Sequence, residues 1–369
     1  MTHQPLLKSL PLLSALLALG ACGADHNATP APAPASTATA SAAAAASPVV
    51  KEAFITASAE ADNIDSVATW HAPDGSARLY ATAKHTDAVR VYDAETGKPI
   101  GSIGSPGSGA GQLSRPNGIA VIDDRLFVVE RDNHRVQVFA LPDGKPLGSF
   151  GADVLKKPYG LWIRAVDGGY DVDVTDDWMA EDTSEADAHK RVLRFRVGAG
   201  KSLDAQQIGA FGEADGAGRL HVVESIWGDP VHDNLLVAEE YEAAGSRLKL
   251  FDLKGNYRGR DVGNGIYRHQ AEGIALYACT DGSGYWIGSD QSVTDQRYLV
   301  FDRVSFDYLG ALRPAEASNT DGVWLDQRAT ARFPAGAFYV AHNDHAVAAF
   351  DWRDIATPLK LRTDCTLAP

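Results

Sequence analysis

One short pattern recurs six times in the sequence and constrains the fold more than any other feature. In each copy, alternating apolar residues end on an aromatic residue, which is usually followed by aspartate. A period of two residues is typical of a β-strand with one buried face. The copies end on Tyr92, Phe139, Phe195, Phe251, Phe301 and Phe350. This spacing of roughly 50 residues matches one four-stranded blade, so the pattern predicts an all-β fold, a six-bladed β-propeller.

The segments between the copies agree with many short strands. Short apolar stretches rich in Val, Tyr, Phe and Ile are separated by Gly, Asp, Asn and Pro, and no long amphipathic helix is evident. A pair of β-sandwiches is the competing architecture, but it fits the regular spacing less well. Residues 111–121 and 126–136 resemble an NHL repeat, which is itself a propeller blade.

The amino terminus has the order of a secretory signal. Residues 1–21 contain a lysine and then an apolar stretch that is too short to span a bilayer stably. The end of this segment, Leu19-Gly20-Ala21-Cys22, resembles the bacterial lipobox, which implies that Cys22 is lipidated and begins the mature chain. The alternative is an ordinary signal peptide cut after Ala21. Gly23 after the cysteine favours the outer membrane of a Gram-negative cell envelope, with a periplasmic location as the other outcome.

The remaining chain divides into a linker and one domain. Residues 22–50 are almost wholly Ala, Pro, Thr and Ser, so they cannot bury a core and are expected to form a flexible tether. We assign residues 51–369 to the propeller. Cys279 and Cys365 lie in this domain, and an oxidising compartment permits a disulfide between them, which stays a hypothesis from sequence alone.

Composition limits the partners. The formal net charge of −14 argues against binding to nucleic acid. We therefore expect no nucleic-acid partner. We also expect contact with the membrane through the lipid anchor only, and a monomer.

Motifs of several enzyme classes are missing, and carboxylates stand at predicted strand ends instead. There is no Gly-x-Ser-x-Gly elbow, no phosphate-binding loop and no His-Glu-x-x-His. Glu239 and Glu240 end one apolar strand, and because side chains alternate, only one of the two can face a given side. Equivalent ends of successive blades gather around a propeller axis, so such residues can converge on Ca²⁺, which prefers oxygen ligands. The alternative for each residue is a solvated loop carboxylate.

The order of these motifs carries a family resemblance. The first half contains Asp65–Trp70, Thr82–His85, Arg115-Pro116-Asn117 and Tyr159-Gly160-Leu161. The second half contains Glu224, Ala238-Glu239-Glu240, Glu272–Tyr277, Asp281–Ile287, Gln291, Thr320-Asp321-Gly322 and Ala337–Asp344. From about Asp62 to Trp352, this order resembles that of the β-propeller phytases, a family of six-bladed, calcium-dependent phosphatases of inositol hexakisphosphate.

The resemblance implies a set of site residues. Ca²⁺ ligands or their close supports would be Asp65, Glu224, Glu240, Glu272, Gln291 and Asp321. Phosphate oxygens would be held by Lys84, Arg115 and Tyr159. In such a site calcium neutralises the phosphate ester and activates water, while Lys84 supplies a point charge and Arg115 a fork of donors.

Several positions depart from the family pattern. Ser66 and Gln270 stand where the family has aspartate, His85 stands where it has lysine, and the run Val174–Asp177 ends in two aspartates where a basic residue is expected. Each departure removes a ligand charge or a phosphate-binding charge, and calcium affinity depends on the charge of the ligands.

The resemblance thus implies a surface-anchored, calcium-dependent phosphomonoester hydrolase similar to a 3-phytase. Its substrate would be phytate or a similar polyphosphorylated small molecule. Two alternatives remain open at this point. One is a non-catalytic NHL-type propeller lipoprotein that binds a partner, and the other is a calcium-dependent lactonase or similar hydrolase on the same fold.

Overall fold

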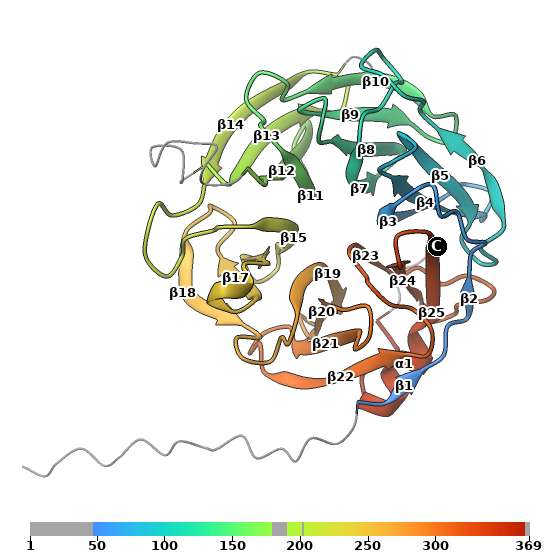
Figure 1. Ribbon diagram of the computed structural model, residues 1–369, viewed down its shortest axis with the longest axis vertical. Coiled ribbons are helices and arrows are strands. Elements are labelled where there is room, and N and C mark those ends of the chain that lie inside the picture. The colour runs from blue at the N-terminus through green and yellow to red at the C-terminus, as the bar shows by residue number, and fades with distance from the viewer. Residues whose placement is uncertain (1–46, 179–189, 201–202, 366–369) are drawn as a thin grey trace, which may run out of the picture. The chain divides into compact units, whose positions relative to one another are not determined.

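Six sheets, antiparallel except at the edge of one, surround a central axis in the computed structural model (Figure 1). The first three blades are formed by β3 (Ile64–His71), β4 (Ala77–Ala83), β5 (Ala88–Asp93) and β6 (Pro99–Ile103); by β7 (Pro116–Ile122), β8 (Arg125–Glu130), β9 (Arg135–Ala140) and β10 (Lys145–Phe150); and by β11 (Pro158–Val166), β12 (Gly169–Asp176), β13 (Val192–Gly198) and β14 (Ala205–Phe211). Blade 4 contains β15 (Val223–Asp229), β16 (Asn234–Glu239), β17 (Arg247–Phe251) and β18 (Tyr257–Val262), with the 3₁₀ helix η3 (Glu242–Ala244) between β16 and β17. Blade 5 contains β19 (Gln270–Ala278), β20 (Gly284–Gln291), β21 (Arg297–Asp302) and β22 (Tyr308–Pro314), and blade 6 contains β23 (Val323–Asp326), β24 (Ala337–His342) and β25 (Ala346–Asp351).

The six repeated aromatic residues all occupy the third strand of a blade. Phe139, Phe251, Phe301 and Phe350 are fully buried, and Tyr92 and Phe195 are nearly so. Each aromatic side chain therefore packs in the interior, against a neighbouring sheet, where an apolar side chain is required. Aromatic contacts cross the blade boundary, as between Phe211 and Phe251, whose ring centroids are 5.4 Å apart. The six-bladed propeller predicted from this pattern is confirmed.

The amino-terminal segment completes the circle of blades. Strand β2 (Phe54–Ile55) pairs antiparallel with β25 and becomes the fourth strand of blade 6. Strand β1 (Val49–Val50) pairs parallel with β22, at the outer edge of blade 5. Residues 49 and 50, which the sequence analysis placed in the tether, thus belong to a sheet. The N-terminal and C-terminal parts of the domain are held together by the hydrogen bonds of a β-ladder.

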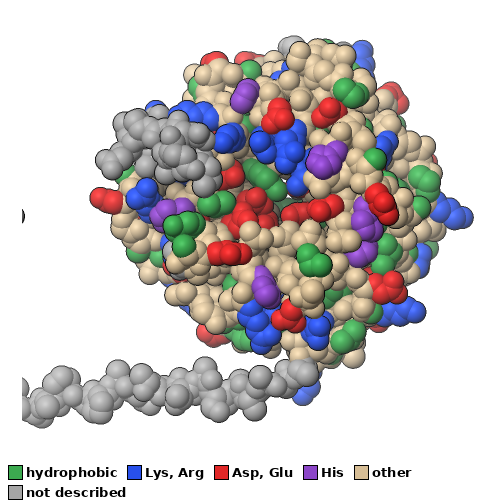
Figure 2. All heavy atoms as spheres, in the orientation of Figure 1, with side chains coloured by type: hydrophobic (Ala, Val, Ile, Leu, Met, Phe, Trp, Pro, Cys, Tyr) green, Lys and Arg blue, Asp and Glu red, His purple; other side chains and the backbone are tan. Residues whose placement is uncertain are grey.

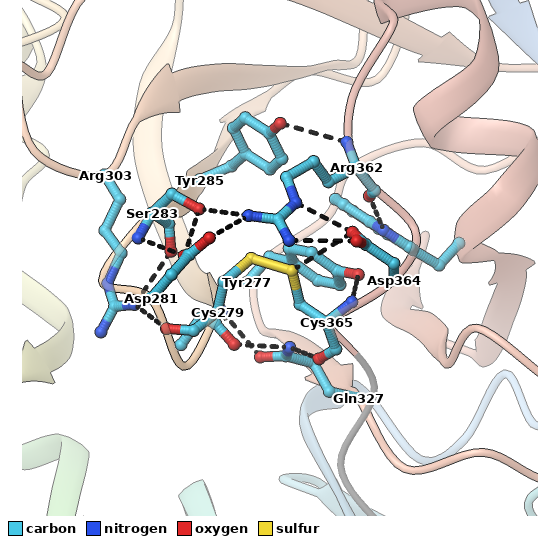
Figure 3. The surroundings of a disulfide bond; sticks show 12 residues. Tyr277, Cys279, Asp281, Ser283, Tyr285, Arg303, Gln327, Arg362, Asp364 and Cys365 are labelled. Atoms are coloured by element: carbon cyan, nitrogen blue, oxygen red, sulfur yellow. Dashed lines mark hydrogen bonds and ion pairs between the residues drawn. A yellow bond between two sulfur atoms is a disulfide. The ribbon is translucent and has the colours of Figure 1, made fainter.

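The carboxyl-terminal segment packs on the last two blades. Helix α1 (Trp352–Leu359) begins after Asp351, whose side chain accepts a hydrogen bond from the backbone of Arg353 as an N-cap. Beyond it, Cys365 forms a disulfide with Cys279 at the end of β19 (Figure 3). The disulfide hypothesis is therefore confirmed.

The structure describes residues 47–178, 190–200 and 203–365. The signal peptide at 1–21, the lipidation site Cys22 and most of the tether lie outside the described residues. No helix in the described ranges is both long and apolar enough to cross a membrane.

Candidate functional site

The innermost strands of all six blades share one local feature near their first residues. At the start of each strand, or directly before it, a residue with a polar group is followed by a small one: Asp65-Ser66, Asn117-Gly118, Tyr159-Gly160, Glu224-Ser225, Glu272-Gly273 and Asp321-Gly322. In five of these strands the ladder register shifts at this pair, and in blade 6 the pair directly precedes β23. Such bulges redirect a side chain away from the alternating pattern. We call the first members of the pairs, Asp65, Asn117, Tyr159, Glu224, Glu272 and Asp321, the axial residues.

The small second members let neighbouring blades approach closely. A Cβ atom on Gly160 would lie 2.4 Å from the carbonyl oxygen of Glu224, and one on Gly273 would lie 2.6 Å from that of Asp321. The Gly273 amide donates to this same Asp321 oxygen at 2.9 Å. The small residues Ser66, Gly118, Gly160, Ser225 and Gly322 line a cavity along the axis. Figure 2 shows acidic side chains gathered at the centre of this face, beside a group of basic ones.

Three glutamates form the tightest group of this face, which we call the carboxylate cluster. Glu224, Glu240 and Glu272 each place one carboxylate oxygen within 4.8 Å of the others. Burial raises the pKa of Glu224 and of Glu272 well above the usual range, and the charges of the neighbouring glutamates add to this rise. Oε2 of Glu224 is buried without a hydrogen-bond partner. Three mutually repelling carboxylates with an unpaired oxygen fit a site for a hard cation.

The two consecutive glutamates of blade 4 have different roles. Glu239 is fully buried, and its carboxylate accepts hydrogen bonds from the backbone amides of His221 at 2.7 Å and Val222 at 3.0 Å. Glu240 points to the other side and enters the carboxylate cluster. The prediction that only one of the pair can face the site is confirmed.

A cation of the protein lies beside this acidic group. Nζ of Lys84 is 2.6 Å from Oδ2 of Asp65, and the hydroxyl of Tyr159 donates to this oxygen at 3.0 Å. Burial alone would lower the pKa of Lys84, but the charges of Asp65 and Asp321 raise it, so the amine stays protonated. Burial and the nearby carboxylates raise the pKa of Tyr159 far above its usual value, which keeps its hydroxyl a donor.

Blade 6 adds another carboxylate. Nε2 of Gln291 donates to Oδ1 of Asp321, while Oδ2 of Asp321 is buried and unpaired. Burial and the charge of Asp65 raise the pKa of Asp321 to about 8, even though Lys84 acts in the opposite direction. Two of the axial carboxylates thus carry an oxygen that no described group satisfies.

Arg115 is the one sequence candidate for which no described contact leads to the other candidates. Its backbone amide donates to Asp87 at 2.7 Å, and its backbone has a φ of 49°. Its Nε atom is buried without a partner. The remaining eight candidates of the domain are linked by hydrogen bonds, ion pairs or the electrostatic interactions described above.

Two of the three single-residue departures from the phytase pattern lie within this network. The hydroxyl of Ser66 donates to Asp65 at 2.8 Å, and Nε2 of Gln270 donates to Oε1 of Glu240. Each is a neutral donor that supports a carboxylate. His85 is held through its backbone amide, which donates to the carbonyl of Asp62 at 2.9 Å.

Two further residues belong to the site and were not among the predicted site residues. Asn117 is fully buried, and neither atom of its amide group has a hydrogen-bond partner. Its place before Gly118 is the signal that could have found it, because the glutamate of Glu272-Gly273 has the same place. Asp177 lies near Glu240; burial and the charge of Glu240 raise its pKa to about 7 against the opposing effect of Arg191.

Comparison with known proteins supports one blade in particular. Residues 113–139 match the family model of the NHL repeat. This range covers β7, β8 and most of β9, so the NHL resemblance seen in the sequence is confirmed.

Matches to solved structures are remote. Hydrazine synthase of Kuenenia stuttgartiensis is similar with a TM-score of 0.48 and 14% identity, over 84% of this chain and 85% of that one. A chain of the nidogen/laminin complex is similar with a TM-score of 0.49 and 15% identity, over 72% of this chain and 85% of that one. No curated protein matches the sequence.

Proposed function

We propose that this protein is a calcium-dependent phosphomonoesterase of the β-propeller phytase type, acting on phytate or a similar polyphosphorylated small molecule. The observation that carries the proposal is the carboxylate cluster next to a protonated lysine. Hydrolysis of a phosphate ester needs a cation that polarises the phosphate oxygens and a fixed positive group that holds the negatively charged ester in place. The cluster would hold the cation, and Lys84 would hold the ester.

The described residues fit a calcium ion. The donor set consists of carboxylate and amide oxygens, which are the ligands of hard cations. Buried unpaired oxygens of Glu224 and Asp321 would gain a partner in a bound ion. Glu224, Glu240 and Glu272 would hold one ion, and Asp65, Asp321 and Gln291 extend the oxygen-rich surface toward Lys84. When bound, calcium would supply charge neutralisation of the phosphate and a more acidic water.

Two side chains have the protonation state that phosphate binding requires. Lys84 is charged, and Tyr159 keeps its proton. Their shared partner Asp65 is fully buried and holds both donors at one carboxylate oxygen. A phosphate oxygen arriving there would accept from an N–H of Lys84 that Asp65 does not use, and from Tyr159 once the single proton of this hydroxyl turns from Asp65 to the phosphate.

The test is phosphate release from calcium phytate. Wild-type protein should liberate inorganic phosphate in millimolar calcium and lose this activity in excess chelator. Glu240→Gln should reduce the rate most strongly at low calcium, and added calcium should partly restore it. The matched control is Glu316→Gln, because Glu316 is an exposed glutamate of the loop after β22. Absence of phosphate release from the wild type at every calcium concentration would exclude the proposal.

A second function is favoured by the NHL match. NHL-type propellers are a fold on which many functions are built, so a non-catalytic role in binding a partner at the same face is the alternative. In that case calcium would still stabilise the protein. Lys84→Met would change ligand binding, and neither the wild type nor the variant would release phosphate.

We also propose the lipid-anchored location at the bacterial cell envelope, because Cys22 lies in the lipobox-like segment.

A further inference from the structure

A second cavity lies at the other end of the innermost strands from the axial residues. Its volume is about 400 Å³, and its wall takes the last residues of β3, β7 and β19 together with parts of β15 and β23. Asp65 is the second and His71 the last of the eight residues of β3, so the two ends of this strand lie about 20 Å apart. The cavity contains no residue of the carboxylate cluster.

Three tryptophans line this cavity, which we call the tryptophan cavity: Trp70, Trp227 and Trp324. The rings of Trp227 and Trp324 meet edge to face, with centroids 5.3 Å apart and an angle of 78° between their planes. Both residues are half-buried, and both also line the small cavity along the axis. The two rings therefore stand between the axial cavity and the tryptophan cavity. The face of an indole ring is an apolar, electron-rich surface.

A chain of hydrogen bonds fixes one of these rings. Nε1 of Trp324 donates to Oγ1 of Thr69 at 2.9 Å, and this hydroxyl donates to Oδ2 of Asp326 at 2.9 Å. Nε2 of His71 lies 2.6 Å from the same oxygen, and Oδ1 of Asp326 accepts from the backbone amide of Arg328 at 3.0 Å. The carboxylate of Asp326 is thus engaged by the protein itself, and the Trp324 ring is preorganised.

The polar groups that remain for a ligand carry both signs of charge. The indole N–H of Trp227 has no acceptor among the described residues. Asp123 and Arg328 are exposed and contribute one charge of each sign to the wall. The other carboxylate, that of Asp326, is paired with His71. The tryptophan cavity therefore has no surplus of charge that would select an anion or a cation.

We propose that the tryptophan cavity binds an uncharged pyranose ring, the terminal residue of a glycan or a free sugar, against the indole rings of Trp227 and Trp324. Small-molecule sites have volumes of about 300 to 1,000 Å³, so the cavity has room for such a ring. The C–H groups on one side of a pyranose complement an electron-rich indole face. The sugar hydroxyls are donors and acceptors, which suits the Trp227 N–H and the opposite charges of Asp123 and Arg328.

Strand β19 offers a substitution that fills the cavity. Leu276 and Ala278 share one side of this strand, and both line the cavity. The backbone of Ala278 is paired with the side chain of Gln327 through hydrogen bonds of 2.7 and 3.0 Å, which a larger side chain at position 278 does not remove. Ala278→Phe should therefore occupy the space of the sugar. The matched control is Ala165→Phe, at the corresponding end of β11 in blade 3, whose described residues do not line the cavity.

The experiment measures sugar binding by the full chain with saturation-transfer NMR and calorimetry. The probes are the methyl pyranosides of glucose, galactose, mannose and N-acetylglucosamine, with the acyclic polyol sorbitol as the control ligand. At least one pyranoside should bind with a millimolar Kd, equally in calcium and in chelator, and with saturation concentrated on the C–H protons of one face. Sorbitol should not bind. Trp227→Phe, which removes the N–H and part of the ring face, should raise Kd about 3- to 10-fold. Ala278→Phe should abolish binding, and Ala165→Phe should bind like the wild type.

Each contrary outcome overturns the inference. These outcomes are binding of none of the four pyranosides up to about 100 mM, equal binding of sorbitol, or wild-type affinity in a folded Trp227→Phe or Ala278→Phe protein. An equal loss in Ala165→Phe would mean that the sugar does not lie in the cavity. Loss of binding in chelator would instead place the sugar at the carboxylate cluster. Should Ala278→Phe fail to fold, Trp227→Phe and the calcium dependence still decide. Phosphate release from phytate is a separate measurement, so this inference and the proposed function can fail independently.

Discussion

Removal of calcium should make the stability of this protein fall as the pH rises. The folded state raises the pKa of Asp321 from its ordinary value of 3.8 to about 8, chiefly through burial. A carboxyl group with a raised folded-state pKa contributes stability that is fully present below its unfolded pKa and is lost as the pH rises through its folded pKa. For Asp321 the loss falls between about pH 4 and pH 8, and at about 1.4 kcal/mol per pKa unit it amounts to at most about 6 kcal/mol. Glu224 and Glu272 act in the same direction.

Calcium should reverse this behaviour at neutral and alkaline pH. A ligand at 100 times its Kd stabilises the native state by about 2.7 kcal/mol, and 1 kcal/mol moves Tm by about 2 to 4 °C in a domain of this order of size. We therefore expect Tm in chelator to fall between pH 5 and pH 8, and saturating calcium to raise Tm at pH 8 by roughly 5 to 10 °C. At pH 5 the gain should be smaller, because protons compete with the cation for the same oxygens.

One substitution separates this reasoning from a general effect of salt. Glu272→Gln removes a buried charge from the carboxylate cluster, so at pH 8 it should raise Tm in chelator and reduce the gain from calcium. Differential scanning calorimetry of both proteins at pH 5 and pH 8, with Glu316→Gln as the surface control, measures both effects. A calcium-independent Tm at pH 8, or a lower Tm of Glu272→Gln in chelator, would refute the assignment of these carboxylates to a cation site.

Four further outcomes are expected. Lys84→Met should raise KM for phytate in steady-state assays, and added calcium should not restore it, because the lost contact is to phosphate. Asn117→Leu should raise the unfolding free energy of the ligand-free protein by about 1 to 3 kcal/mol in urea titrations, since it removes two unpaired polar atoms from a fully buried position. Double substitution of Cys279 and Cys365 by Ser should lower the unfolding free energy by about 4 to 5 kcal/mol under the same conditions, as loop closure over 86 residues predicts. Cys22→Ser should abolish metabolic labelling with palmitate and move the protein out of the membrane fraction.

The blades could be predicted from sequence because a single physical requirement repeats in each of them. The third strand of every blade packs between two sheets, so its inward positions must be apolar and its last large position is aromatic. The alternation of Glu239 and Glu240 could be predicted for the same reason, from the period of a strand alone. Ring closure could not. Strands β1 and β2 have two residues each, which is too short for any period to appear. Their partners lie far away in the sequence: Val49 pairs with Arg313 of β22, and Phe54 pairs with Ala349 of β25.

Most of the predicted site residues converge, but the reason lies in the backbone and is not visible in residue types. Five of the six axial residues leave the alternating pattern of their strands at a bulge, so strand periodicity would have misplaced them. The bulge is possible because the residue that follows is small. A Cβ atom added to Gly160 would lie 2.4 Å from the carbonyl oxygen of Glu224, which is too close for two such atoms. Arg115 precedes such a pair by two positions and is not an axial residue, whereas Asn117 is. The pair, and not the charged residue, is the feature that marks a position on the axis.

This arrangement explains how one fold can present an asymmetric site from six equivalent strands. Blades 4, 5, 6 and 1 place Glu224, Glu272, Asp321 and Asp65 at the axis, while blades 2 and 3 place the neutral Asn117 and Tyr159 there. The field at the axis therefore runs from an acidic side to a side that offers only neutral donors and acceptors. A cation is attracted to the acidic side, and an anion bound to that cation can extend toward the neutral side without meeting further carboxylates. In every blade a small residue follows the axial residue. Substitution of an axial residue would therefore alter the charge of the site without altering the fold.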